Sequence, residues 1–129
     1  MHPMNADIVA RAEENDAFRR ELVTGPHSQV VLMTIQPGEE IGEEVHEDND
    51  QTLVFIAGDG EAILAGETSA VHAGRLAFVP AGTRHNFRNT GVTPLRLYTI
   101  YAPAHHEPGT VHQTKAEADA AEEAEAGHG

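Results

Sequence analysis

The sequence predicts one all-β domain, built as an antiparallel barrel or sandwich of short strands. The chain has 129 residues, a length that suits a single domain with its own core. Its 12 glycines and 7 prolines suit many tight turns. Short apolar or alternating runs recur at regular spacing with glycine or proline between them, and closing such a sheet removes its exposed edges.

Eight strands are expected in the middle of the chain. They cover residues 18–23, 29–35, 53–57, 61–65, 68–72, 75–79, 84–88 and 95–101. The β-branched run at 29–35 predicts a buried strand. Alternation in the last strand places Leu95, Leu97, Thr99 and Tyr101 on one face. We interpret Gly58-Asp59-Gly60 as a hairpin turn that joins 53–57 to 61–65.

The two ends of the chain differ from this pattern. Residues 1–24 are expected to form an N-terminal arm with a short helix that Asn5 caps. Residues 25–103 form the predicted barrel. Residues 104–129 form a loop and an acidic tail that has no apolar stripe, so we expect the tail to be partly mobile.

Composition excludes several classes of partner. The chain has 8 Lys and Arg against 21 Asp and Glu, a formal net charge of −13, whereas nucleic acids and anionic membranes need a basic surface. It has no cysteine, and therefore neither disulfides nor thiolate ligands. The first residues lack a basic and an apolar leader segment, and no apolar run approaches membrane-spanning length. A cytoplasmic protein is therefore predicted.

Four side chains are interpreted as one divalent-metal site inside the barrel. Glu44 and His46 are two residues apart, so on an extended strand both point to the same face. Gln51 follows after an acidic turn, and His85 lies in a second stretch that is rich in glycine and proline. No other cofactor-binding residues are predicted.

These two stretches resemble the two motifs of the cupin superfamily. The first reads Gly38, five residues, Glu44-Val45-His46, four residues, Gln51, six residues, Gly58. The second reads Gly74, five residues, Pro80-Ala81-Gly82, two residues, His85, three residues, Asn89. The second motif matches completely, whereas the first keeps the spacing and changes two of its three ligands. The chain is similar to small single-domain bacterial cupins that carry a mannose-6-phosphate-isomerase-like label.

The resemblance implies a double-stranded β-helix, or jelly roll, with the metal inside and an open coordination position toward the mouth. By position, Glu44 and His46 replace the two histidines of the first motif, Gln51 replaces its glutamate, and His85 is the last histidine. The likeness also implies a homodimer. Its glycines and Pro80 are expected to serve turn geometry, and Asn89 to tie a turn.

The altered ligand set has chemical consequences. The usual three histidines and one carboxylate become two histidines, one carboxylate and one amide, so an imidazole nitrogen is replaced by a harder oxygen. This favours Fe(II), Mn(II) or Co(II), with Zn and Ni still compatible. If Gln51 instead only hydrogen-bonds a bound water or ligand, the remaining Glu44, His46 and His85 form the two-His-one-carboxylate set of many non-haem iron oxygenases.

Other charged residues and histidines have simpler interpretations as surface residues. Seven acids lie between residues 39 and 50, namely Glu39, Glu40, Glu43, Glu44, Glu47, Asp48 and Asp50. They lack the alternation of an EF-hand loop, so a calcium site is not favoured. Arg75, Arg84, Arg88 and Arg96 are expected to pair with carboxylates on the surface, and the alternative is that one of them faces a ligand carboxylate. Surface positions are also expected for His27, His72, His105, His106 and His112. The last three share one segment, and folding over the barrel mouth is the alternative for them.

Three functions of different classes follow. The first is a metal-dependent small-molecule dioxygenase, or a related lyase or isomerase, in which Glu44, if only weakly bound, leaves the metal and acts as general base. The second is a non-catalytic sensor that binds a small metabolite in the barrel through the metal. The third is a scaffold that the metal stabilises. No motif outside the two metal motifs specifies a substrate.

Overall fold

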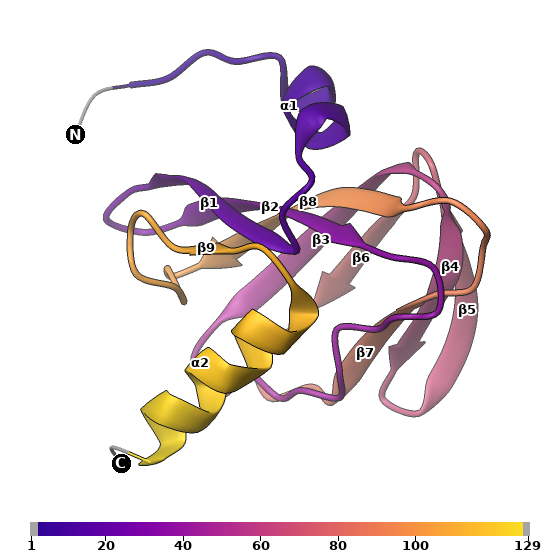
Figure 1. Cartoon of the computed structure of the whole chain (residues 1–129). Coiled ribbons are helices and arrows are strands. Elements are labelled where there is room, and N and C mark those ends of the chain that lie inside the picture. Colours follow the sequence, from indigo (N-terminus) through magenta and orange to yellow (C-terminus); the bar gives the residue numbers. More distant parts are fainter. Residues whose placement is uncertain (1–2, 128–129) are drawn as a thin grey trace.

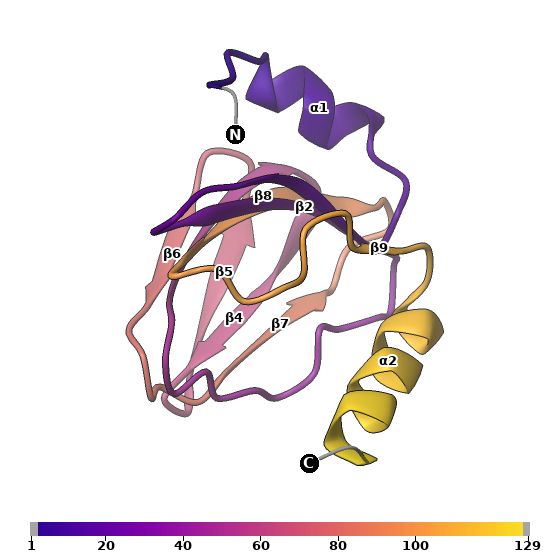
Figure 2. The same cartoon turned by 90° about the vertical axis from the view of Figure 1, so that its left-hand side faces the viewer.

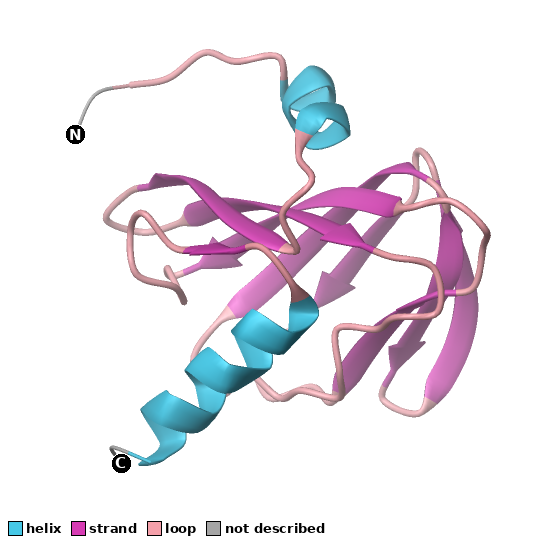
Figure 3. Cartoon of the chain, in the orientation of Figure 1, coloured by secondary structure: helices cyan, strands magenta, loops and turns pink. Residues whose placement is uncertain are grey.

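A computed structural model describes residues 3–127 of the chain, with side chains up to residue 123. It confirms the all-β prediction, with two antiparallel sheets and a short helix toward each end of the chain (Figure 1, Figure 3). Within the described residues, one sheet has six strands in the order β6-β3-β8-β2-β1-β9. The other has three, in the order β5-β4-β7. This is the double-stranded β-helix that the motifs imply.

The strands begin and end close to where the sequence predicts. The elements are α1 Ile8–Glu14, β1 Arg19–Thr24, β2 Gln29–Ile35, β3 Asp50–Ala57, β4 Asp59–Leu64, β5 Glu67–His72, β6 Leu76–Val79, β7 His85–Asn89, β8 Leu95–Ala102, β9 Val111–His112 and α2 Lys115–Gly127. Each of the eight expected strands is present, and the largest difference is at β3, which begins at Asp50 instead of residue 53. Strand β9 was not expected.

The predicted hairpin at Gly58-Asp59-Gly60 is wrong. Strand β3 pairs with β6 and β8, and β4 pairs with β5 and β7, so the chain changes sheet at Gly58. Gly58 has a φ of +92°, which glycine adopts readily, and a Cβ at Gly60 would lie 2.3 Å from the carbonyl oxygen of Arg88. The glycines thus allow a change of sheet and a close approach between strands.

The two helices lie outside the sheets (Figure 1, Figure 2). Helix α1 packs on the six-stranded sheet, against β2, β3 and β8. The expected cap at Asn5 is wrong: Asp7 directly precedes the helix, and its carboxylate accepts a hydrogen bond from Ala10 N at 3.0 Å. In α2, Ala118 is buried and belongs to the hydrophobic core.

The mobility expected for residues 104–129 stays a prediction. Residues 1, 2, 128 and 129, which belong to the two expected end segments, lie outside the described residues. Neither helix of the described part combines the length and the apolar composition that a membrane crossing requires.

The inner face of the six-stranded sheet positions the site. The predicted alternation in β8 is confirmed, because Leu95, Leu97, Thr99 and Tyr101 are all buried. Register extends each of these positions across the sheet. Leu97 lies between Met33 and Phe55, and Tyr101 lies between Gln29 and Gln51. One end of this face is therefore apolar and the other polar.

Candidate metal centre

Glu44 and His46 lie on the segment between β2 and β3, and not in a regular strand as expected. Glu44 is held by a β-bridge to His85: Glu44 N donates to His85 O and His85 N donates to Glu44 O, both at 2.9 Å. Side chains still alternate along the segment, since Val45 is 41% exposed whereas His46 is 9% exposed. The bridge therefore joins the two motif segments at the residues predicted to bind metal.

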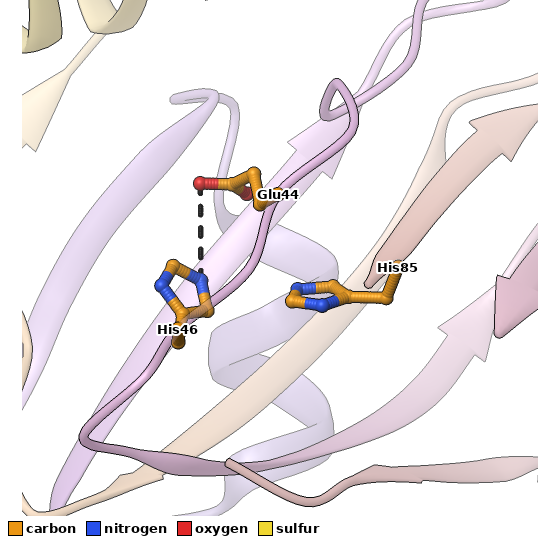
Figure 4. A group of neighbouring side chains, drawn as sticks. All are labelled: Glu44, His46 and His85. Carbon is orange, nitrogen blue, oxygen red and sulfur yellow. Dashed lines mark ion pairs between the residues drawn. The ribbon is translucent and has the colours of Figure 1, made fainter. Parts of the chain in front are cut away.

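Glu44, His46 and His85 converge on one point (Figure 4). Each offers one ligand atom, and these atoms all lie within 4.8 Å of one another. His46 Nε2 is 3.8 Å from Glu44 Oε2, and the centroids of the two imidazole rings are 5.2 Å apart. Three of the four predicted ligands are thus brought together from two distant parts of the chain.

Both histidines present an unused nitrogen to this point. His85 Nδ1 lies 2.8 Å from the carbonyl oxygen of Thr83, which can only accept, so Nδ1 carries the proton and Nε2 carries the lone pair. His85 Nε2 and His46 Nε2 are both buried without a hydrogen-bond partner. Buried polar atoms are nearly always paired, so two orphaned nitrogens beside a carboxylate fit a bound cation.

Burial controls the ionisation of all three groups. It raises the pKa of Glu44 to about 7, and nearby Glu122 adds to this effect. Burial also lowers the pKa of His46 to about 4 and lowers that of His85. The histidines are therefore neutral near pH 7, as metal ligands must be, and a divalent ion would compensate the charge that burial disfavours on Glu44.

Gln51, the fourth predicted ligand, is buried in β3. Its Nε2 donates to Thr99 Oγ1 at 3.1 Å and to Tyr101 Oη at 3.3 Å. These bonds orient the amide and leave Oε1 buried without a partner. The Tyr101 ring, which lies beside Gln51 in register, has its centroid 5.8 Å from that of His46. Whether Oε1 binds the metal stays a prediction.

A second aromatic group borders the site. The ring of His105 lies 4.3 Å from that of His46, and His106 lies 4.7 Å from His105 and 5.3 Å from Tyr101, all between centroids. His105 is exposed, as a surface position predicts, although its ring lies beside that of His46, whereas His106 is half-buried. Tyr101, which is buried, forms part of the wall here.

Most of the acidic cluster faces outward. Glu40 and Glu43 form ion pairs with Arg88 and Arg84 at 3.2 and 3.4 Å, and they line an open groove of about 740 Å³ on the outside of the barrel. Asp50 accepts a hydrogen bond from Ala81 N. Of the seven acids, Glu44 belongs to the convergent group. The surface pairing expected for Arg84 and Arg88 is confirmed.

Arg19 is a buried charged residue near this site that the sequence did not single out. It is 3% exposed, and its charge lowers the pKa of both Glu44 and His46. The local pattern gave little signal, because Arg19 opens a strand in which charged and apolar residues are mixed. Its inward position follows from the pairing of β1 with β2, in which Arg19 lies opposite the buried Met33.

Comparisons with known proteins agree with this geometry. The family model described as "Cupin domain" matches residues 31–101. An uncharacterized Bacillus subtilis protein, YrkC, is 44% identical over 127 residues, which cover 94% of this chain and 68% of YrkC. An uncharacterized protein of Acanthamoeba polyphaga mimivirus is 40% identical over 102 residues, covering 76% of this chain and 64% of that protein. The chain thus spans about two thirds of the length of these relatives.

A solved structure extends the likeness to the whole fold. The crystal structure of BH2720 from Bacillus halodurans has a TM-score of 0.91 and 46% identity, covering 92% of this chain and 95% of that one. More distantly, a Salmonella mannose-1-phosphate guanylyltransferase is 27% identical over 81 residues, only 17% of its length. The name of that enzyme therefore describes a much larger protein.

Proposed function

Because the chain belongs to the cupin domain family, we propose that it is an enzyme that acts on a small molecule with one divalent metal ion. One observation carries the proposal: three ligand atoms within 4.8 Å of one another, two of them buried imidazole nitrogens without partners. Glu44, His46 and His85 would hold the ion, and Gln51 Oε1 would either join them or bind a metal-bound water.

This ligand set favours oxygen-accepting ions. Two imidazoles and a carboxylate, with or without an amide oxygen, suit Fe(II), Mn(II) or Co(II), and Zn and Ni are also compatible. Such an ion supplies Lewis-acid polarisation of a substrate oxygen or a binding position for O₂. A dioxygenase is the reaction class that we favour, followed by a lyase or isomerase that moves a proton beside a carbonyl.

The protein side chains would then divide the remaining tasks. Glu44 has the more accessible side chain, 20% exposed against 7% for His46, so once it leaves the ion it is placed to take a proton from a substrate entering from solvent. The Thr83 carbonyl fixes the His85 ring, and the hydroxyls of Thr99 and Tyr101 fix the Gln51 amide. A preorganised site of this kind needs little rearrangement on binding.

Oxygen uptake tests the proposed reaction class. Fe(II)- and Mn(II)-loaded protein is assayed in an oxygen electrode with a panel of enols, flavonols and β-diketones. We expect metal-dependent uptake with at least one class, abolished in His85→Ala. If folded, metal-loaded protein consumes no more oxygen than His85→Ala across the panel, the dioxygenase proposal fails.

A non-catalytic binder is the second candidate. The observation that favours it is crowding, because the His105 ring lies 4.3 Å from His46 on one side and buried Tyr101 lies near it on another. A binder would retain a panel compound in a metal-dependent way and return it unchanged, which product analysis of the same samples detects.

A further inference from the structure

Arg19 points into the barrel from β1, which lies between β2 and the edge strand β9 of the six-stranded sheet. It pairs with Met33 on β2, which pairs with Leu97 on β8, which pairs with Phe55 on β3. Residues paired in register share a face, and Met33, Leu97 and Phe55 are 0–1% exposed in the core. Arg19, itself 3% exposed, therefore continues an apolar row of the inner face.

The guanidinium has only part of its hydrogen-bonding capacity in use. Nη1 lies 3.2 Å from Nδ1 of His112, the residue opposite Arg19 on β9, and the guanidinium carbon is 5.4 Å from the centroid of the Phe18 ring. Nε is buried without a hydrogen-bond partner. Within the described side chains, no carboxylate lies within ion-pair distance of Arg19.

Other arginines have polar partners that Arg19 Nε lacks, and Nε of Arg20, the next residue on β1, donates to Asn15 Oδ1 at 3.1 Å. Arg84, Arg88 and Arg96 each form an ion pair with a carboxylate, and Arg84 and Arg88 do so in solvent. Taking a guanidinium out of water without a counter-ion is expensive, and a buried charge is retained when something anionic offsets it. Arg19 is therefore a buried cation without an anionic partner among the described side chains, and we expect an anion from outside the chain to be that partner.

Its neighbours connect Arg19 with the metal centre. The charge of Arg19 acts on His106 and Tyr101 as well as on Glu44 and His46. His106 Nε2 is also buried without a partner, and the rings of His106 and Tyr101 lie 5.3 Å apart. Tyr101 in turn lies 5.8 Å from His46. Buried nitrogens without hydrogen-bond partners thus extend from His46 and His85 through His106 to Arg19 on β1.

We propose that Arg19 binds the carboxylate of an anionic substrate inside the barrel, with the Nε–H edge of its guanidinium as the donor. This inference rests on the proposed function, because it places the reacting part of that substrate at the metal centre. A guanidinium matches a planar carboxylate through two parallel N–H···O bonds. The net charge of −13 opposes multiply charged anions, so a monocarboxylate fits better than a phosphate ester.

A titration of the protein with propionate, and with neutral propionamide of the same shape, tests the assignment. Both are added to metal-free and Zn-loaded protein, and the Arg19 Nε–H resonance is followed by NMR. We expect propionate to shift this resonance and to saturate in both forms, and propionamide to leave it in place. Propionate binding that leaves the Arg19 resonance unmoved, or no propionate binding at all, would overturn the proposal.

Variants sharpen the assignment. Arg19→Met keeps the length and apolar stem of the side chain, and we expect at least tenfold weaker propionate binding. The matched control is Arg88→Met, which removes an exposed arginine of the other sheet and should change the affinity less than twofold. If Arg19→Met does not fold, Arg19→Lys keeps the charge and loses the two-donor edge, and it should also weaken binding severalfold. Unchanged affinity in a folded Arg19 variant contradicts the proposal.

Metal content separates this inference from the function on which it rests. Arg19→Met should retain the metal content of the wild-type protein, because Arg19 is not a ligand. Loss of propionate binding with metal retained supports the carboxylate site. Wild-type protein that binds propionate through Arg19 and takes up no metal would leave the carboxylate site standing and remove the metal-dependent function.

Discussion

Charged residues on the inside and on the outside of the barrel differ in exposure and in whether they have partners. On the outside, Glu43 and Arg84 are 65% and 71% exposed and satisfy each other at 3.4 Å. On the inside, Glu44 is next to Glu43 in sequence, yet its side chain is only 20% exposed and faces two histidine nitrogens that lack partners. A high density of acidic residues in the sequence therefore does not identify the candidate metal site in this protein. The locating feature is burial together with unused hydrogen-bonding capacity.

The same contrast separates the arginines. Arg88 and Arg84 have carboxylate partners in solvent, where an ion pair contributes little. Arg19 is buried beside His112 without a carboxylate among the described side chains. Substitutions inside the barrel should therefore change ligand binding, whereas substitutions outside should change almost nothing.

The largest expected effect is the loss of metal-dependent stability in His46→Ala. An ion that binds only the folded state stabilises it by about 2.7 kcal/mol when its free concentration is about 100 times Kd, on the order of 10 °C in a domain of this size. We expect Mn(II) to raise the melting temperature of the wild-type protein by that amount and to leave His46→Ala unchanged. His72→Ala, an exposed histidine on β5, is the control and should respond like wild type. An equal Mn(II) response in His46→Ala would refute the inner site.

The next effect concerns Gln51 and tests whether its oxygen serves the metal. Gln51→Leu removes the unpartnered Oε1, and we expect metal affinity to fall by about 10- to 100-fold, measured by calorimetry. Gln51→Glu keeps an oxygen at this position and should bind metal at least as tightly as wild type. If Gln51→Leu binds metal with wild-type affinity, the amide serves only Thr99 and Tyr101.

Glu44 predicts a pH dependence in the metal-free protein. Its folded-state pKa of about 7 lies above the ordinary 4.5, so its contribution to stability is fully present below pH 4.5 and is lost as pH rises through 7. With chelator present, Glu44→Gln should therefore gain stability relative to wild type between pH 6 and pH 8.5, by about 1.4 kcal/mol. Denaturant titrations of both proteins at the two pH values measure this, and a constant difference would contradict it.

The smallest effect is expected on the outside. Glu43→Gln breaks the exposed pair with Arg84 and should change the free energy of unfolding by less than about 0.5 kcal/mol, without affecting metal binding. Urea denaturation and the same calorimetric titration measure both quantities. A large loss of metal affinity in Glu43→Gln would show that the outer groove participates in the site.

Local sequence signals predicted most of the strands and the three side chains that converge. Strand ends were readable because glycine and proline mark them, and the ligand spacing placed Glu44, His46 and His85 correctly. The partners of most strands were not readable. Gly58 and Gly60 have the composition of a hairpin, yet the actual hairpin is the next one along, where Leu64 pairs with Glu67.

The environment of the site was less predictable than its ligands. His105 and His106 reach it through a loop after β8, and Arg19 reaches it through the register of β1 with β2. These placements depend on tertiary packing and strand pairing, which carry no local signal in a single sequence. The same applies to Ala118 of α2, whose burial in the core the composition of the tail did not indicate.

The metal content of the purified chain tests the central claim most directly. Protein purified without chelator is analysed for Mn, Fe, Co, Ni and Zn, alongside His46→Ala and His72→Ala prepared in the same way. The account predicts about one divalent ion per chain in the wild-type protein and in His72→Ala, and almost none in folded His46→Ala. Equal metal content in His46→Ala, or wild-type protein that neither retains a divalent ion nor takes one up when it is supplied, would contradict it.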